Sequence, residues 1–591
     1  MSMEDKITPS KKLARIEYGF SKIIANKKIL ILLIIPLILL LIDNRWIFPN
    51  PFSGFADDWL YTGYFLNFQS FHSVFGDLYF SSRLPWIIPG YLIYNLFPVS
   101  ISVYLLHLIF YYCSIISIYL ILRYTISEQA GFLSALLFSF YPFFMREIGA
   151  NYVFGAIIAY QFLTLLMITK SKNSKNRFFF LFFAGSFSVL MLFSNLFTII
   201  LLPTIGLYYI AMYYDNIPEK IIPSAAAFAL GTLSVFGLMG IFNMILVGNF
   251  DFYSPQIRAL FYYSNVTNEW WHPLSEWIFN TPWLILPVIG AVISVIYMIT
   301  IIHSSEKRNT VHLFFVLNYL MLFVLFFGME LSGKTVYEAV YYTSIIFPSL
   351  FLAWGLFLHR MFEKFSNKNE ACFSYLCVVL LVLGYVIETR SSIEEFFITD
   401  TLLWIDAFFI IAIVALFYCF NRIINQKNLM ILGFFLICLL VILYIGNFSV
   451  AFENGFDSYE NGYYAIMDST ILIKETFPDS DIKFWYNTSE SYNKVSYGNF
   501  FTLVNCVYLW GRSKYSSDFP LLPFDEGPNT SLTNQYQNIV VLSTNDNASE
   551  MVNLSFSKYD ERPVLISRHV IQHNKIRFNL IFLKVPKEKA S

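Results

Sequence analysis

The sequence predicts an all-α polytopic membrane bundle of about 13 transmembrane helices, followed by a small extracytoplasmic α/β domain at the C-terminus. Only 13% of the 591 residues are charged, against roughly 25% in a typical soluble domain. Mean hydropathy is +0.57, and long apolar runs recur as far as residue 447. Beyond that point the composition turns to Asn, Ser, Asp and Lys. These features exclude a soluble cytosolic enzyme and a disordered hub, and the net charge of −1 argues against nucleic acid as a partner.

The apolar runs are read as spans because a bilayer core needs about 20 apolar residues per helix. The predicted spans lie near 29–43, 100–122, 130–145, 152–169, 178–192, 194–213, 221–247, 282–302, 311–328, 341–358, 371–388, 403–420 and 429–446.

Lys and Arg are distributed unevenly between alternate loops. The leader 1–28 carries seven of them, and no cleavage site follows the first apolar run, so the leader is predicted to stay in the cytoplasm. With that leader, the inside segments hold 20 Lys and Arg, against six in the outside loops before the tail. An odd number of spans then places the tail outside. The transmembrane module is predicted at 29–447 and the soluble domain at 448–591.

Three outside segments are long enough to carry chemistry: 44–99, 248–281 and the tail. In the tail, residues 462–477 have the pattern of an amphipathic helix. Short strands are predicted at 481–486, 500–510, 538–544 and 578–585.

Two adjacent acids, Asp57 and Asp58, stand in the first outside segment among aromatic residues. The apolar spacing that follows predicts a helix lying on the membrane surface. Partial burial and mutual repulsion would raise the pKa of one carboxyl, which suits a general base. The alternative is that both acids are simply solvated in an outside loop.

The arrangement resembles the GT-C superfamily of membrane glycosyltransferases, and within it the branch of protein O-mannosyltransferases and aminoarabinose transferases. Asp57-Asp58-Trp59-Leu60-Tyr61 matches the D-E-x-x-Y type motif of the family's first outside loop, with Asp in place of Glu. Arg83-Leu84-Pro85-Trp86 stands where the family often has a Lys-Pro-Pro segment. The similarity covers about residues 1–450.

The resemblance implies that Asp57 is the catalytic base and that Asp58 orients or polarises the site. The family usually has a second acid near the third and fourth spans. Here that region offers Glu147, with Asn151 where an acid is often seen; an interfacial Arg146–Glu147 ion pair is the alternative.

A polyprenyl-phosphate leaving group needs a cation, because negative charge builds on that phosphate in the transition state. The family's Arg-Tyr before a late proline is Tyr341-Tyr342 here, so the expected Arg is missing. Lys334 is the first candidate to supply the cation in place of the missing Arg. For each candidate cation, the alternative is that its long side chain only anchors the protein at the membrane surface. The implied substrate-binding residues are Tyr61, Arg83, Glu147, Asn151, Arg258, Lys334 and Tyr342.

The resemblance therefore implies a glycosyltransferase that moves a sugar from a polyprenyl phosphate to an acceptor hydroxyl on a protein, lipid or glycan at the outer face of the cell membrane. No cofactor is indicated; a divalent metal ion is left open, with Asp57, Asp58 and Glu147 as its candidate ligands. The alternatives are a non-enzymatic translocase of lipid-linked saccharides and an envelope assembly protein. Transporters place charges inside their spans, and the predicted spans here are nearly free of them, which favours the enzyme.

Overall fold

The computed structural model describes most of the chain as far as residue 364, together with the sheet of the tail. The described residues are 27–42, 47, 57–66, 68–214, 217–265, 284–303, 309–334, 340–364, 465, 468–469, 471–473, 475–477, 482–486, 491–492, 495–496, 521–523, 538–543, 564–573 and 576–584. The spans predicted at 371–388, 403–420 and 429–446 lie outside them.

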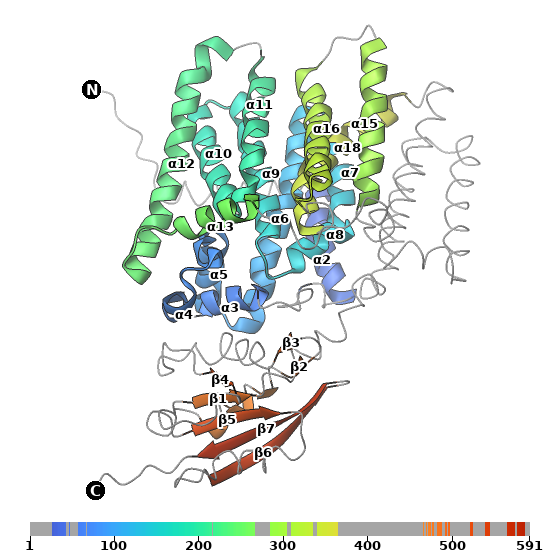
Figure 1. Ribbon diagram of the computed structural model, residues 1–591. Helices are drawn as coiled ribbons and strands as arrows, with labels where there is room; N and C mark the ends of the chain where they lie inside the picture. The colour runs from blue at the N-terminus through green and yellow to red at the C-terminus, as the bar shows by residue number, and fades with distance from the viewer. Residues whose placement is uncertain are drawn as a thin grey trace, which may run out of the picture.

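The described part of the helical region is a bundle of apolar helices (Figure 1). Within it, six helices are long and apolar enough to cross a membrane, in the segments 101–125, 154–172, 177–194, 196–213, 221–247 and 310–331. The helices are α2 (Lys27–Ile42), α6 (Val99–Thr125), α9 (Phe154–Lys172), α10 (Arg177–Ser194), η3 (Leu196–Leu201), α11 (Leu202–Tyr213), α12 (Ile217–Val247), α15 (Ile285–His303), α16 (Thr310–Leu331), α17 (Val340–Thr343), η6 (Ser344–Ile346) and α18 (Phe347–Lys364).

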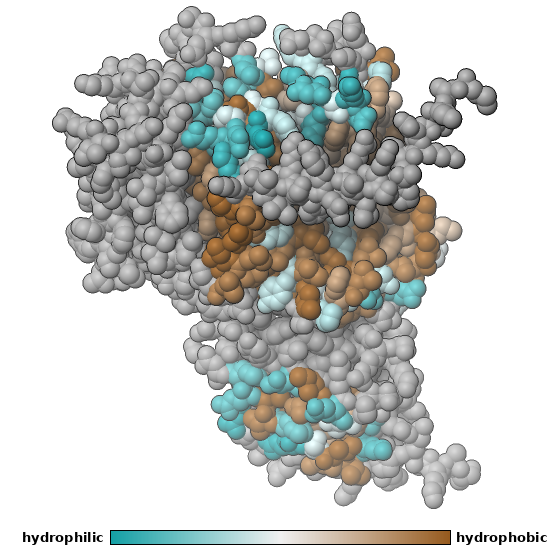
Figure 2. All heavy atoms as spheres, turned by 180° about the vertical axis from the view of Figure 1, so that it is seen from behind, coloured by the Kyte–Doolittle hydropathy of each residue, from teal (hydrophilic) through white to brown (hydrophobic). Residues whose placement is uncertain are grey.

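The surface of the bundle has the apolar belt that a membrane requires. Figure 2 shows hydrophobic side chains gathered around the middle of the helical part, with hydrophilic ones at the end farthest from the sheet. Helix α12 is the clearest case, because only 22% of its most apolar window is buried in the protein. Its exposed leucines and isoleucines contact lipid in a bilayer.

One expected span is broken. The run at 130–145 forms two short helices, α7 (Glu128–Ser139) and α8 (Pro142–Gly149), and not the single span predicted from its hydropathy. Pro142 causes the break, because proline has no backbone N–H and favours the first turn of a new helix. The start of α7 is set by Ser127, whose Oγ accepts a hydrogen bond from the Ala130 N–H at 3.2 Å.

Two glycines allow α10 and α12 to pack with their backbones in contact. A Cβ added at Gly185 would overlap the carbonyl oxygen of Phe228, and one added at Gly231 would overlap that of Phe182. Thr232 Oγ1 also donates to the Gly185 carbonyl at 3.2 Å. Small residues at a helix crossing are the usual way to achieve such an approach in membranes.

The first outside segment folds into the end of the bundle nearest the sheet (Figure 1). Its elements are α3 (Asp57–Leu66), α4 (Phe68–Phe75), η2 (Tyr79–Ser82) and α5 (Leu84–Leu96). The helix expected after Asp58 exists, but Tyr61, Tyr64 and Phe65 are fully buried in protein. This helix is therefore part of the packed core and does not present these residues to a membrane surface.

The described tail contains a five-stranded sheet in the order β4-β1-β5-β7-β6. Strand β1 is parallel to β4 and β5, and β7 is antiparallel to β5 and β6, with Val540 opposite Phe582. The sheet includes the strands expected at 481–486, 538–544 and 578–585; the one expected at 500–510 lies outside the described residues. The strands are β1 (Ile482–Tyr486), β4 (Leu521–Pro523), β5 (Asn538–Ser543), β6 (Val564–His573) and β7 (Ile576–Lys584), and the separate pair is β2 (Ser491–Tyr492) and β3 (Val495–Ser496).

Candidate active site

Arg83 is a buried cation at the end of the bundle nearest the sheet. It stands between η2 and α5, and only 5% of its surface is exposed. Pro85 in the first turn of α5 needs no partner for its nitrogen and helps to start the helix there. Arg83 Nη1 donates a hydrogen bond to the hydroxyl of Tyr61, on α3, at 2.6 Å. The link joins the two sequence motifs that suggested the family resemblance.

Aromatic rings surround the Arg83 guanidinium. Its Cζ lies 4.6 Å from the centre of the Tyr79 ring, 5.1 Å from that of Tyr152 and 5.5 Å from that of Phe80. We call these three rings and Tyr61 the aromatic cage. Burial disfavours the charged form of Arg83, but the phenol oxygens of Tyr152, Tyr61 and Tyr79 outweigh burial and hold its pKa well above the ordinary value. Cation–π contact adds to this stabilisation.

The cage does not satisfy every donor of the guanidinium. Among the side chains that the structure describes, no carboxylate forms an ion pair with Arg83, and its buried Nε has no hydrogen-bond partner. A buried charge without a counter-ion is costly, and an arginine fork matches carboxylate or phosphate geometry. Within the described residues, the guanidinium therefore keeps a buried donor available to an anion.

Asp57 and Asp58 are the first two residues of α3. Their side chains lie outside the described residues, so the backbone alone locates them. Asp57 lies four positions before Tyr61, one helical turn away, and Asp58 lies four positions before Thr62. A helix N-terminus favours negative charge. The structure thus places the backbone of both acids within a turn of the aromatic cage.

Glu147 and Asn151 lie in the segment that runs from the end of α8 into the start of α9. Glu147 is 4% exposed, and burial raises its pKa to about 7, an effect that nearby Arg146 partly offsets. Asn151 Nδ2 donates to Thr62 Oγ1 at 2.8 Å. The segment therefore packs directly on α3, one turn after the paired acids.

Tyr342, in the short helix α17, also reaches the cage. Its hydroxyl lies within electrostatic reach of the Arg83 guanidinium. Its ring packs against Phe154 and Phe197, with centres 6.0 and 5.5 Å apart. Tyr61, Arg83 and Tyr342, from three separate parts of the chain, are therefore brought together in the fold.

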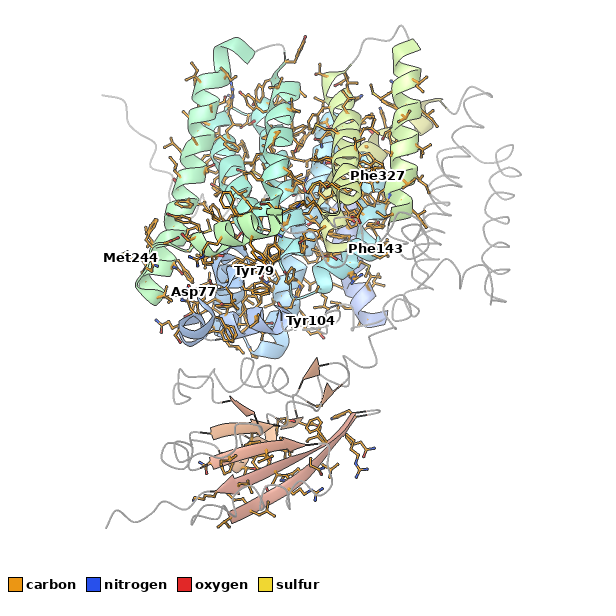
Figure 3. All side chains as sticks on the ribbon, viewed as in Figure 1. Asp77, Tyr79, Tyr104, Phe143, Met244 and Phe327 are labelled. Carbon is orange, nitrogen blue, oxygen red and sulfur yellow. The ribbon has the colours of Figure 1, made fainter. Side chains whose placement is uncertain are left out.

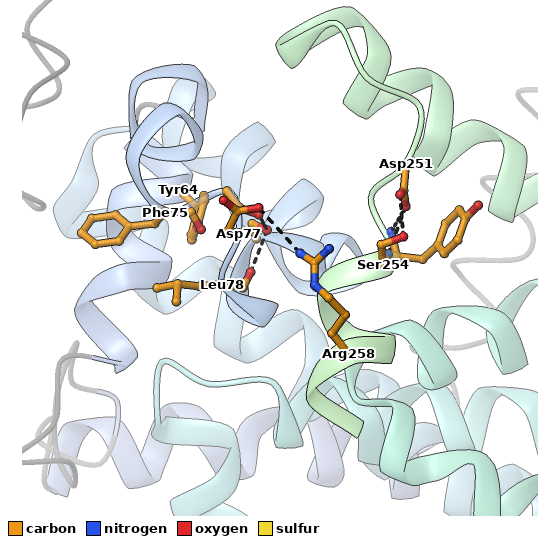
Figure 4. A network of polar contacts seen from close by, with 10 residues as sticks. Tyr64, Phe75, Asp77, Leu78, Asp251, Ser254 and Arg258 are labelled. Atoms are coloured by element: carbon orange, nitrogen blue, oxygen red, sulfur yellow. Dashed lines mark hydrogen bonds and ion pairs between the residues drawn. The ribbon is translucent and has the colours of Figure 1, made fainter. Parts of the chain in front are cut away.

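Arg258 and Lys334 have other partners. Arg258 forms an exposed ion pair with Asp77, 3.6 Å between Nη2 and Oδ1, which Figure 4 shows beside the start of α13 (Ser254–Asn265). Lys334 Nζ donates to the carbonyl oxygen of Ser264, at the other end of α13, at 2.6 Å. Both cations hold α13 at the rim of the site, and neither contact involves the Arg83 cage.

Three residues of the aromatic cage escape sequence reasoning: Phe80 and the two tyrosines Tyr79 and Tyr152. Figure 3 shows Tyr79 at the end of the bundle that faces the sheet. The chain contains 40 tyrosines, so neither stood out. The only available signal was position in the sequence: Tyr79 lies four residues before Arg83, and Tyr152 directly follows Asn151. For metal binding, the described side chains contain no group of three His, Cys, Asp or Glu suited to an ion.

Comparison with known proteins shows which solved structures share this fold. No family model and no curated protein matches the chain. Solved structures do match, among them two of ArnT from Cupriavidus metallidurans. The apo structure is 10% identical, with a TM-score of 0.50, and the structure bound to undecaprenyl phosphate is 11% identical, with a TM-score of 0.52. Each match covers 93% of this chain and 97% of the other.

The six long apolar helices and the shared fold support a multi-pass membrane protein. The fold of the chain is that of ArnT, which confirms the fold that the resemblance in the sequence implied.

Proposed function

We propose that the chain is a glycosyltransferase that uses a polyprenyl-phosphate sugar and acts at the end of the bundle bearing the sheet. Two findings support the proposal. The fold is shared with ArnT, one structure of which binds undecaprenyl phosphate. The second is the buried Arg83 with an unsatisfied Nε, whose guanidinium is hydrogen-bonded to Tyr61, one helical turn after Asp57 on α3. Arg83 is the observation that carries the proposal.

Arg83 binds the phosphate of the lipid carrier. Its cage holds the guanidinium in place before the substrate arrives, so little reorganisation accompanies the build-up of charge on the leaving phosphate. The raised pKa keeps it charged at any physiological pH. Tyr342, within electrostatic reach of Arg83, borders the same anion site. Lys334 and Arg258 are further cations at the rim, available to a headgroup that displaces their present contacts.

Asp57 accepts the proton of the acceptor hydroxyl, and Asp58 orients or polarises the site. The acceptor oxygen attacks the anomeric carbon, the bond from that carbon to the phosphate oxygen breaks, and polyprenyl phosphate leaves. One displacement inverts the anomeric configuration. With a pKa of about 7, Glu147 keeps a proton to donate to a sugar hydroxyl near neutral pH.

The positive-inside rule puts this end of the bundle outside the cell. The acceptor is a protein, lipid or glycan there. A translocase of lipid-linked saccharides remains the alternative class, and it requires no chemical turnover.

The test is a transfer assay with the purified full chain in lipid nanodiscs, a polyprenyl-phosphate sugar and a hydroxyl acceptor. Released polyprenyl phosphate is measured. We expect Asp57→Asn to reduce turnover by about 10²–10⁴-fold, and Arg83→Gln by about 10²–10³-fold. Arg123→Gln is the matched control, since it removes an exposed arginine in the last turn of α6, at the end of the bundle away from Arg83. Wild-type turnover that survives in both Asp57→Asn and Arg83→Gln would contradict the assignment, and movement of the intact lipid-linked sugar without release would favour the translocase.

A further inference from the structure

Next to the aromatic cage, two neighbouring rings from different elements each carry a buried polar atom without a partner. Trp86 follows Arg83 on α5, and His107 lies on α6; each is 1% exposed. Their rings pack with centres 5.8 Å apart. Trp86 Nε1 and His107 Nε2 are both buried without a hydrogen-bond partner.

The two atoms are complementary. An indole nitrogen is only a donor. His107 forms a hydrogen bond to the backbone of Ile148, and because Nε2 has no partner, Nδ1 makes it. A carbonyl accepts only from an N–H, so the proton of the neutral imidazole is on Nδ1 and Nε2 carries a free lone pair. One donor and one acceptor thus belong to rings in contact, and they do not bond to each other.

We propose that an ordered water molecule bridges Trp86 Nε1 and His107 Nε2, and that His107 is a positioning residue for the neighbouring site. The water accepts from the indole and donates to the imidazole. Buried waters typically occupy such places, between polar groups that the protein leaves unsatisfied.

The bridging water would connect the aromatic cage around Arg83 with the segment that carries Glu147 and Asn151. Trp86 packs edge-on against Tyr61, with ring centres 6.5 Å apart, on the side of the cage next to Arg83. His107 holds the carbonyl of Ile148, the residue after Glu147. Asn151 fastens the far end of the same segment to Thr62. Contacts therefore run from α3 through α5, α6 and the 147–152 segment back to α3. The positioning role rests on the proposed function; the water site does not.

The water is tested by a high-resolution structure of the full chain. We expect density at about 2.7–3.2 Å from both nitrogens. A direct bond between the nitrogens, or an empty space, would overturn the site. A double-mutant cycle with Trp86→Phe and His107→Phe provides a second measurement, in which the thermal midpoint should fall less in the double variant than the two single shifts together. Strict additivity would count against a shared water. Trp354→Phe is the control, because Trp354 is similarly buried (2%) and its indole nitrogen is not among the unpartnered atoms.

The positioning role is tested by transfer activity. We expect His107→Phe to lower kcat/KM for the lipid-linked sugar by about tenfold. His107→Asn, whose amide nitrogen approximates Nδ1, should restore most of that loss by keeping the bond to Ile148. His107→Phe with unchanged kcat/KM, or His107→Asn without rescue, would refute the positioning role. An inactive wild type would reject the proposed function and leave the water site to be judged by its density and the mutant cycle.

Discussion

Glu147 illustrates how far burial changes a single residue in this protein. At 4% exposure its carboxyl keeps its proton up to a pH of about 7, whereas the same group in the unfolded chain ionises near 4.5. Between these values the unfolded state releases a proton that the folded state retains. The contribution of Glu147 to the free energy of unfolding therefore falls as pH rises from about 4.5 to about 7, and it levels off above that pH.

A substitution isolates this contribution. We expect Glu147→Gln to match wild type in stability near pH 4.5 and to exceed it by up to about 3 kcal/mol above pH 7, from the size of the pKa shift. Thermal midpoints of both purified chains, measured across that range, give the difference. A gap between the two chains that stays constant with pH would show that Glu147 does not titrate as described.

At the scale of elements, the contact between α10 and α12 depends on two residues without side chains. The backbone carbonyls opposite Gly185 and Gly231 belong to regular helices and cannot turn aside as a flexible side chain could. Helix α12 also supports the site end of the bundle, since Phe242 packs against Phe68 of α4 with ring centres 5.9 Å apart. A shift of α12 would therefore displace α4 and the helices of the first outside segment that pack with it.

Two glycines on the same helix allow a matched comparison. Gly231→Ala should lower stability by about 1–3 kcal/mol, the usual cost of overpacking. Gly237→Ala should leave stability unchanged or raise it by about 0.5–1 kcal/mol, because nothing lies within 4 Å of the added Cβ and alanine favours a helix. Thermal midpoints of the full chain in one detergent decide between them. Equal shifts for the two variants would show that the close helix contact is absent.

For the whole molecule, the order of the helices places a group of basic residues at the end of the bundle opposite the candidate site. Helix α6 ends beside Arg123, α9 ends at Lys172 and α10 begins at Arg177, all at the end of the bundle away from Arg83. Basic residues favour the cytoplasmic side. The site is therefore expected to face the other compartment.

Labelling with a membrane-impermeant maleimide tests this orientation. We expect Gln69→Cys, on an exposed position of α4, to react in intact cells. Lys175→Cys, exposed between α9 and α10, should react only after the membrane is opened. The unsubstituted chain measures the background from native cysteines. Reaction of both variants in intact cells, or of Lys175→Cys alone, would reverse the proposed orientation.

The sequence by itself determined most of the apolar helices that the structure describes, and it marked residues that the fold brings together around Arg83. Hydropathy and helical hydrogen bonding are local, so apolar runs such as 154–172 can be recognised without knowing their partners, and the family motif marked Tyr61 and Arg83. The break at Pro142 could also have been predicted from the sequence, because a proline favours the first turn of a new helix; hydropathy alone did not indicate it.

Only the tertiary structure decided which residues surround Arg83. Tyr152 comes from a segment 69 positions away, and its presence in the cage depends on how α8 and α9 pack on α3. Packing also brings Asn151 into contact with Thr62, and it places Lys334 and Arg258 at the rim, where they contact other residues. Burial and long-range contact set these roles, and neither follows from spacing along the chain.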